Sequence, residues 1–218
     1  MFYDCHAHEI AKQDGGFVIA LENQSKGFGL TNKQIIELEM KDTFVPVQYV
    51  TNSWNMTETD IVKYHPRLEK YSVEQVIQDI AKRQPKGIII DTLNDPFWQI
   101  KDYWELLARY PQIPFLLSHA GGYKILEFIE ICNFNKNAWI DFSFSHSYFG
   151  LVNEEVELRV VTEVMRYAFE SRVKDKVMFG SDTPFENQEE CIEWYIQNVN
   201  AAIYDGTNWK RFLESIFS

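Results

Sequence analysis

The sequence is short of basic residues. Lysine and arginine together number 21, against 32 aspartates and glutamates, which gives a formal net charge of -11 at neutral pH. Nucleic acids and anionic membranes are bound by basic faces, so this balance argues against both as main partners. No apolar run is long enough to span a bilayer, and the N-terminus lacks the basic and apolar regions of a secretory signal. We therefore expect a cytoplasmic protein.

Cysteine is also scarce. The three cysteines are scattered and odd in number, namely Cys5, Cys132 and Cys191. A disulfide framework is therefore excluded, and free thiols in a reducing compartment are predicted. Internal repeats and low-complexity linkers are absent as well. The length of 218 residues allows one domain with a full core. We expect a single domain over residues 1–218.

Short apolar segments alternate with amphipathic segments along the chain. Strands are predicted over residues 2–5, 43–50, 87–91, 115–118, 138–144 and 177–180, with a weaker one over 16–21. Helices are predicted over residues 31–41, 72–83, 95–110, 123–132, 154–171, 188–203 and 209–216. Residues 52–71 are interpreted as a polar loop. Repeated β-then-α units imply a parallel sheet, either a (β/α) barrel or an open doubly wound sheet.

His6 and His8 are the most informative residues. They end the first predicted strand, and side chains at positions i and i+2 of a strand point to the same face. Two imidazoles on one face can bind one metal ion, and imidazole suits zinc and neighbouring divalent metals. The alternative is that both histidines only satisfy buried hydrogen bonds.

Other polar residues also follow predicted strands. In both parallel-sheet architectures functional groups gather at the carboxyl ends of the strands. Three such residues are candidates for the same site: Asp91, His119 and Asp182. Asp91 could equally cap a helix. His146 also follows a strand, but it and His65 are interpreted as ordinary loop residues, since Pro66 biases His65 to extended geometry.

Three segments carry a resemblance to a known family: Asp4-Cys5-His6-Ala7-His8, Ser118-His119-Ala120-Gly121-Gly122 and Phe179-Gly180-Ser181-Asp182-Thr183-Pro184. They resemble the amidohydrolase superfamily, in particular the amidohydrolase 2 branch that includes relatives of aminocarboxymuconate-semialdehyde decarboxylase. The resemblance implies a distorted TIM-type (β/α) barrel with one divalent metal, often zinc, with manganese as an alternative. It makes His6, His8 and Asp182 metal ligands. It also makes Asp182 a proton acceptor and directs His119 at the substrate.

The chain departs from that family at one strand. Family members usually carry another histidine ligand one βα unit before the strand with His119, whereas here the preceding strand ends at Asp91. Either Asp91 replaces that ligand, or one βα unit has been lost and His119 binds the metal. Some superfamily members bridge two metals with a carboxylated lysine. Lys86 lies at the wrong, N-terminal end of its strand for that role, so a single metal is predicted.

These observations predict a metal-dependent hydrolase. It would use metal-activated water on an amide, lactone or ester of a small polar substrate. A non-oxidative decarboxylase of an aromatic or unsaturated acid is the second interpretation, because the same metal could hold a carboxylate. A non-catalytic barrel that binds a metal or ligand is the third. A homodimer is the default expectation for quaternary structure.

Overall fold

Eight parallel strands form the centre of the protein, in the sequential order β1 to β8. The computed structural model describes residues 2–22, 29–38, 42–143, 155–199 and 206–217. The strand bounds are β1 Tyr3–Ala7, β2 Gly15–Ile19, β3 Phe44–Tyr49, β4 Ile61–Tyr64, β5 Gly87–Asp91, β6 Phe115–Ser118, β7 Ala138–Asp141 and β8 Val177–Met178. Nearly all strand residues are buried, which explains the near-continuous apolar runs.

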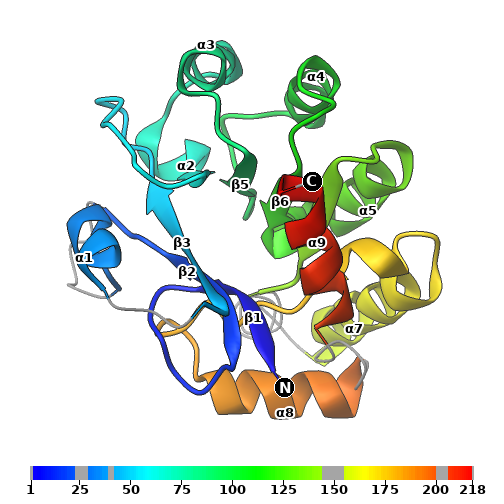
Figure 1. Ribbon diagram of the computed structural model, residues 1–218. Helices are drawn as coiled ribbons and strands as arrows, with labels where there is room; N and C mark the ends of the chain where they lie inside the picture. The colour runs from blue at the N-terminus through cyan, green and yellow to red at the C-terminus, as the bar shows by residue number, and fades with distance from the viewer. Residues whose placement is uncertain (1, 23–28, 39–41, 144–154, 200–205, 218) are drawn as a thin grey trace.

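Helices surround the strands, as in a TIM barrel (Figure 1). Their bounds are α1 Asn32–Glu37, α2 Pro66–Glu69, α3 Val73–Arg83, α4 Ile100–Arg109, α5 Ile125–Phe134, α7 Glu155–Glu170, α8 Gln188–Asn198 and α9 Thr207–Phe217. Two short 3-10 turns, η1 His119–Lys124 and η2 Lys174–Lys176, precede α5 and β8. Local caps explain several starts. Thr31 and Ser72 each form a reciprocal capping box, with Gln34 and Gln75.

The barrel closes at a seam between β8 and β1. These strands form no continuous ladder, but three backbone hydrogen bonds cross the seam, from the N–H of Cys5 to Phe179, of Asp182 to His6 and of His8 to Thr183. An isolated bridge also pairs Ala7 with Thr183. The seam therefore lies beside the predicted metal ligands, and its bonds fix them relative to one another.

The barrel is complete in its strands, so the loss of a βα unit is wrong. The strand missing from the sequence interpretation is β4, which lies within the segment taken as a polar loop. It pairs with β3 through Val47 and Ile61 and with β5 through Val62 and Ile88. The strand that precedes His119 is therefore the fifth, and Asp91 stands at its end.

Opposite ends of the barrel differ sharply. Helix α9 lies across the end at which the strands begin (Figure 1), and its Trp209, Phe212 and Ile216 join an apolar cluster inside the barrel. A larger apolar cluster lies between the strands and the outer helices. All three cysteines are free, as predicted, and they are buried. None of the helices in the described ranges is long and apolar enough to cross a membrane.

Candidate metal centre and active site

Polar side chains from five strand ends meet in one pocket at the end of the barrel opposite α9. The pocket has a volume of about 270 Å³. Its polar lining is His8, Lys63, His65, Arg67, Asp91, His119 and Asp182, and its apolar lining is Leu21, Leu68, Leu93 and Phe185. The structure thus brings four of the five predicted site residues into the pocket lining. The fifth, His6, lies buried directly beneath them.

His6, His8 and Asp182 form a compact group of potential metal ligands. Their ligand atoms all lie within 4.8 Å of one another. Oδ1 of Asp182 lies 3.3 Å from Nε2 of His6 and 3.2 Å from Nε2 of His8. Two imidazoles and a carboxylate that converge in this way are a suitable donor set for one divalent ion.

The protonation state of His8 shows that this group of ligand atoms is stabilised by a cation. Its Nδ1 lies 2.8 Å from the carbonyl oxygen of Ile19, which can only accept a hydrogen bond. Nδ1 therefore carries the proton, and burial lowers the pKa of His8, so the ring is neutral. The lone pair of Nε2 then faces the carboxylate of Asp182. Two electron-rich atoms in contact are stabilised by a cation between them, so the residues present fit a metal ion.

A cation already stands beside this group. The ammonium of Lys63 lies 2.8 Å from Nε2 of His6. Burial, and then the charge of Lys63, lower the pKa of His6 to about 4, so this histidine is neutral and offers a lone pair. Burial opposes ionisation of Asp182, but its histidine neighbours, among them the charged His119, hold its pKa below the ordinary value. Burial lowers the pKa of Lys63, while the charges of Asp91, Asp182 and Asp141 oppose that shift, and the amine competes with a metal for His6.

The loop after β8 places Asp182 by close packing and an unusual backbone. Asp182 adopts a left-handed conformation with φ of 64°, which is uncommon for a residue other than glycine. A side chain on Gly180 would meet Cβ of His6 at 2.7 Å. Ser181 donates its backbone N–H and its hydroxyl to the two oxygens of buried Asp4. Asp4 thus joins the loop to the strand that carries both histidines.

His119 lies where both of its ring nitrogens face hydrogen-bond acceptors. It is also left-handed, with φ of 66°. Its Nδ1 lies 2.8 Å from the carbonyl oxygen of Ser143, and its Nε2 lies 3.1 Å from Oδ2 of Asp91. Because both nitrogens face acceptors, both carry protons. Burial opposes this charge, but Asp91 and the more distant Asp182 outweigh it and raise the pKa of His119 to about 9.

Asp91 does not join either group of potential metal ligands among the described residues. Its Oδ2 lies 3.1 Å from Nε2 of both His65 and His119. Burial opposes its ionisation, but these imidazoles and Lys63 hold its pKa well below the ordinary value. As placed here, Asp91 is the counter-ion of His119, and its role as a replacement ligand stays a prediction.

Asp141 supports the site from β7. Its Oδ1 accepts the backbone N–H groups of His119 and Ser143 and the hydroxyl of Ser143, and its Oδ2 lies 3.5 Å from Nδ1 of His6. Burial is outweighed by the contact with Nδ1 of His6 and by the charge of His119, so the pKa of Asp141 falls to about 2. His6, His119 and Asp141 also satisfy the spacing of a metal group. Asp141 contacts Nδ1 of His6 and so orients that ring, and the role of His119 as a metal ligand stays a prediction.

Sequence reasoning missed Lys63 and His65. Lys63 is 1% exposed inside β4, and its position at a strand end was hidden because the strand was not predicted. The interpretation of His65 as an ordinary loop residue is wrong, because it is buried, caps α2 and lines the pocket. The signal was present in Pro66, which favours the first turn of a helix. His146 lies outside the described residues.

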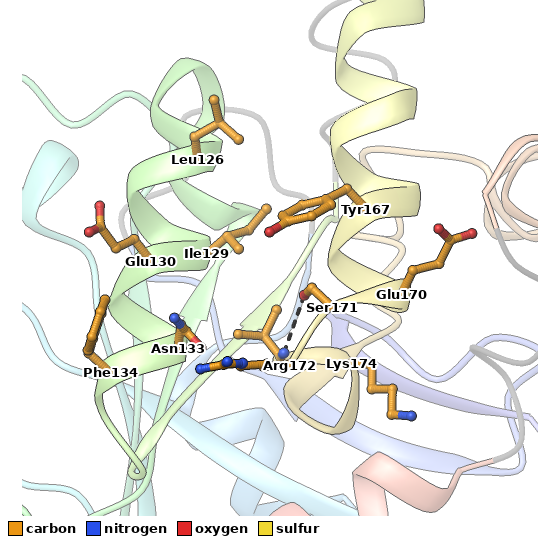
Figure 2. A pocket seen from close by; sticks show the side chains of 11 residues that line it. Leu126, Ile129, Glu130, Asn133, Phe134, Tyr167, Glu170, Ser171, Arg172 and Lys174 are labelled. Carbon is orange, nitrogen blue, oxygen red and sulfur yellow. Dashed lines mark hydrogen bonds between the residues drawn. The ribbon is translucent and has the colours of Figure 1, made fainter.

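A larger cavity lies elsewhere, on the outside of the barrel. It has a volume of about 830 Å³ and lies between α5 and α7 (Figure 2). Its lining includes Leu126, Phe134 and Tyr167 together with the charged side chains of Glu130 and Glu170. No group of potential metal ligands among the described residues lies there. Size alone therefore does not identify the site, and the chemistry favours the strand ends.

Comparisons with known proteins agree with the fold. The profile of the amidohydrolase family matches residues 87–205, more than half of the chain. An uncharacterised TIM-barrel protein from Bordetella bronchiseptica is similar in structure, with a TM-score of 0.68 and 17% identity over 94% of this chain and 79% of that one. A zinc-bound amidohydrolase from Burkholderia multivorans has a TM-score of 0.60 and 13% identity, over 92% of this chain and 84% of its own. No curated protein matches the sequence.

The family profile begins at β5, after the segment with His6 and His8. The fold supplies the missing connection, because the seam bonds place those histidines against Asp182 within the matched segment. The resemblance seen in the motifs is thereby confirmed, and the chain belongs to the amidohydrolase family.

Proposed function

We propose that this protein is a metal-dependent hydrolase of a small polar substrate with an amide, lactone or ester bond. The observation that carries the proposal is the convergence of neutral His6, neutral His8 and ionised Asp182 in a pocket at the strand ends. Membership of the amidohydrolase family supports a metal-dependent enzyme.

The cofactor in this proposal is one divalent ion, with zinc as the first expectation and manganese as the alternative. His6, His8 and Asp182 would hold it. The zinc-bound relative from Burkholderia multivorans supports this choice. A bound divalent ion would lower the pKa of a water molecule and polarise a carbonyl group. Three protein ligands are the usual number at catalytic zinc sites, where one position stays open.

The side chains of this chain divide the proton transfers between them. Asp182 is ionised and lines the pocket, so it can accept a proton from the attacking water. His119 is charged and can return a proton to the leaving group. Asp91 stabilises the charged form of His119, and Asp141 orients His6. Each transfer involves groups that already line or support one small pocket.

The test is a substrate panel assayed on protein loaded with zinc or manganese and on chelator-treated protein. Lactones and esters are followed by proton release, amides by ammonia or amine release, and aromatic acids by carbon dioxide release. We expect hydrolysis of at least one class, lost on chelation and restored by metal. Carbon dioxide release without hydrolysis would replace the proposal with a decarboxylase. Bound metal without turnover on the whole panel would replace it with a non-catalytic barrel.

A further inference from the structure

Arg67 differs from three other arginines of the described residues, each of which makes a hydrogen bond to an acidic side chain. Arg83 makes two hydrogen bonds to Asp79, and Arg166 and Arg211 are each paired with an acidic residue, while Arg67 makes no hydrogen bond to any described residue. Its Nε is nevertheless buried. A buried N–H without an acceptor is unfavourable, because it has lost its hydrogen bonds to water. Such a group gains from any ligand that brings an acceptor to it.

The position of Arg67 makes that ligand part of the active-site pocket. Arg67 lies in α2, directly after the pocket residue His65, and itself lines the same pocket as His8, His119 and Asp182. Its side chain is 39% exposed, so Arg67 is accessible from solvent as well as from the pocket.

Asp91 does not satisfy Arg67. The shortest contact between them joins Nη2 and Oδ1 at 3.8 Å, beyond hydrogen-bond distance. Oδ2 of Asp91 already faces the imidazoles of His65 and His119 at 3.1 Å, and Lys63 lies 3.9 Å away. Asp91 therefore has closer partners, and the donors of Arg67 remain available to a ligand.

We propose that Arg67 binds a carboxylate of the substrate, so that the substrates are small organic acids whose hydrolysable bond lies close to that carboxylate. This rests on the proposed function. The planar guanidinium presents Nε–H and Nη–H side by side, which matches the two oxygens of a carboxylate. The neighbouring Leu68, Leu93 and Phe185 would contact the hydrocarbon part of the substrate. Arg67 is then the specificity-determining residue of the pocket.

The matched pair of probes is benzoate and benzamide, which have the same shape and differ in charge. Their binding to the zinc-loaded protein is measured by calorimetry. We expect benzoate to bind the wild type and to bind Arg67→Gln at least about tenfold more weakly, while benzamide distinguishes the two proteins little. Arg67→Lys keeps the charge without the paired donors and should fall between them. Arg211→Gln, which makes the same change at a surface ion pair, should bind benzoate like the wild type.

Benzoate binding that is undetectable in the wild type, or equal in Arg67→Gln, would overturn the proposal. Unfolding midpoints and zinc contents of all variants establish that they are folded and loaded with zinc. If Arg67→Gln is unfolded or lacks zinc, the benzoate affinity of Arg67→Lys decides the test instead. The outcome also separates the two proposals. Metal-dependent hydrolysis with no effect of Arg67 removes only the carboxylate subsite. Arg67-dependent benzoate binding without any hydrolysis removes only the hydrolase.

Discussion

The two ends of the barrel are built from the same eight strands and have opposite chemistry. Where the strands begin, α9 covers an interior of apolar side chains, including Phe17, Trp139 and Phe212. Where they end, buried histidines, carboxylates and Lys63 face one another around a small pocket. Burying polar groups costs stability unless they are paired, and the apolar end offsets that cost. The end covered by α9 therefore stabilises the fold, and the end with the pocket carries the reactive groups.

The largest expected effect is on catalysis at the open end. Asp182→Asn removes the proton acceptor and weakens a metal ligand, so kcat/KM of the metal-loaded enzyme should fall by about 10³-fold or more. Steady-state assays on the substrate found by the panel measure it. Asp175→Asn makes the same change at an exposed ion pair near α9 and should leave the rate unchanged. Equal rates for Asp182→Asn and the wild type would remove Asp182 from the mechanism.

Substitution at the end covered by α9 should instead lower stability. Phe212 is fully buried under the strands, so Phe212→Ala should lower the free energy of unfolding by about 3–5 kcal/mol. Urea denaturation at 25 °C measures the loss. Phe217, in the same helix, is 52% exposed, and Phe217→Ala should change stability far less. If Phe212→Ala instead reduced zinc affinity with stability intact, the division between the two ends would be wrong.

A smaller effect is expected from the His119–Asp91 pair in metal-free protein. The pKa of His119 is about 9 in the folded protein and 6.5 ordinarily, so its stabilisation is complete below pH 6.5 and is lost as the pH rises through 9. The unfolding free energy should therefore fall by about 3 kcal/mol between pH 6.5 and 9.5. His119→Gln should lack this decrease. An identical pH profile for both proteins would refute the assignment of the charged acid.

The smallest predicted effect concerns Lys63. Its ammonium occupies the lone pair of His6 and repels a second cation, so Lys63→Met should tighten zinc binding by about tenfold. A competition titration with a chromophoric chelator measures the affinity. Lys86→Met makes the same change at an exposed lysine just before β5 and serves as the control, with zinc affinity unchanged. Weaker zinc binding in Lys63→Met would show that the amine acts as a ligand.

The sequence predicted the parts of this site that depend on local pattern. His6 and His8 follow an apolar strand at a spacing of two, and Asp182 follows another, so parallel topology alone gathers them at one end. The barrel architecture also follows from β-then-α alternation together with the family resemblance, but its fourth strand does not. The free state of the three cysteines followed from their number and scatter.

The rest depends on contacts between segments that are far apart. Strand β4 has four residues, and one of them is Lys63, so its pattern resembles a polar loop; only the neighbouring strands on both sides make it a strand. The environment of Asp91 was equally hidden, because its partners come from β4, α2 and η1. Local propensity carries no information on such pairings.

In the proposed function, His6, His8 and Asp182 bind one divalent ion at the carboxyl ends of the strands. The most direct test is elemental analysis of protein purified without chelator or affinity metal, for the wild type and for the double variant His6→Ala and His8→Ala. We predict about one equivalent of zinc or manganese per wild-type chain and almost none in the double variant. Full metal content in the double variant, or none in the wild type after reconstitution, would contradict the account.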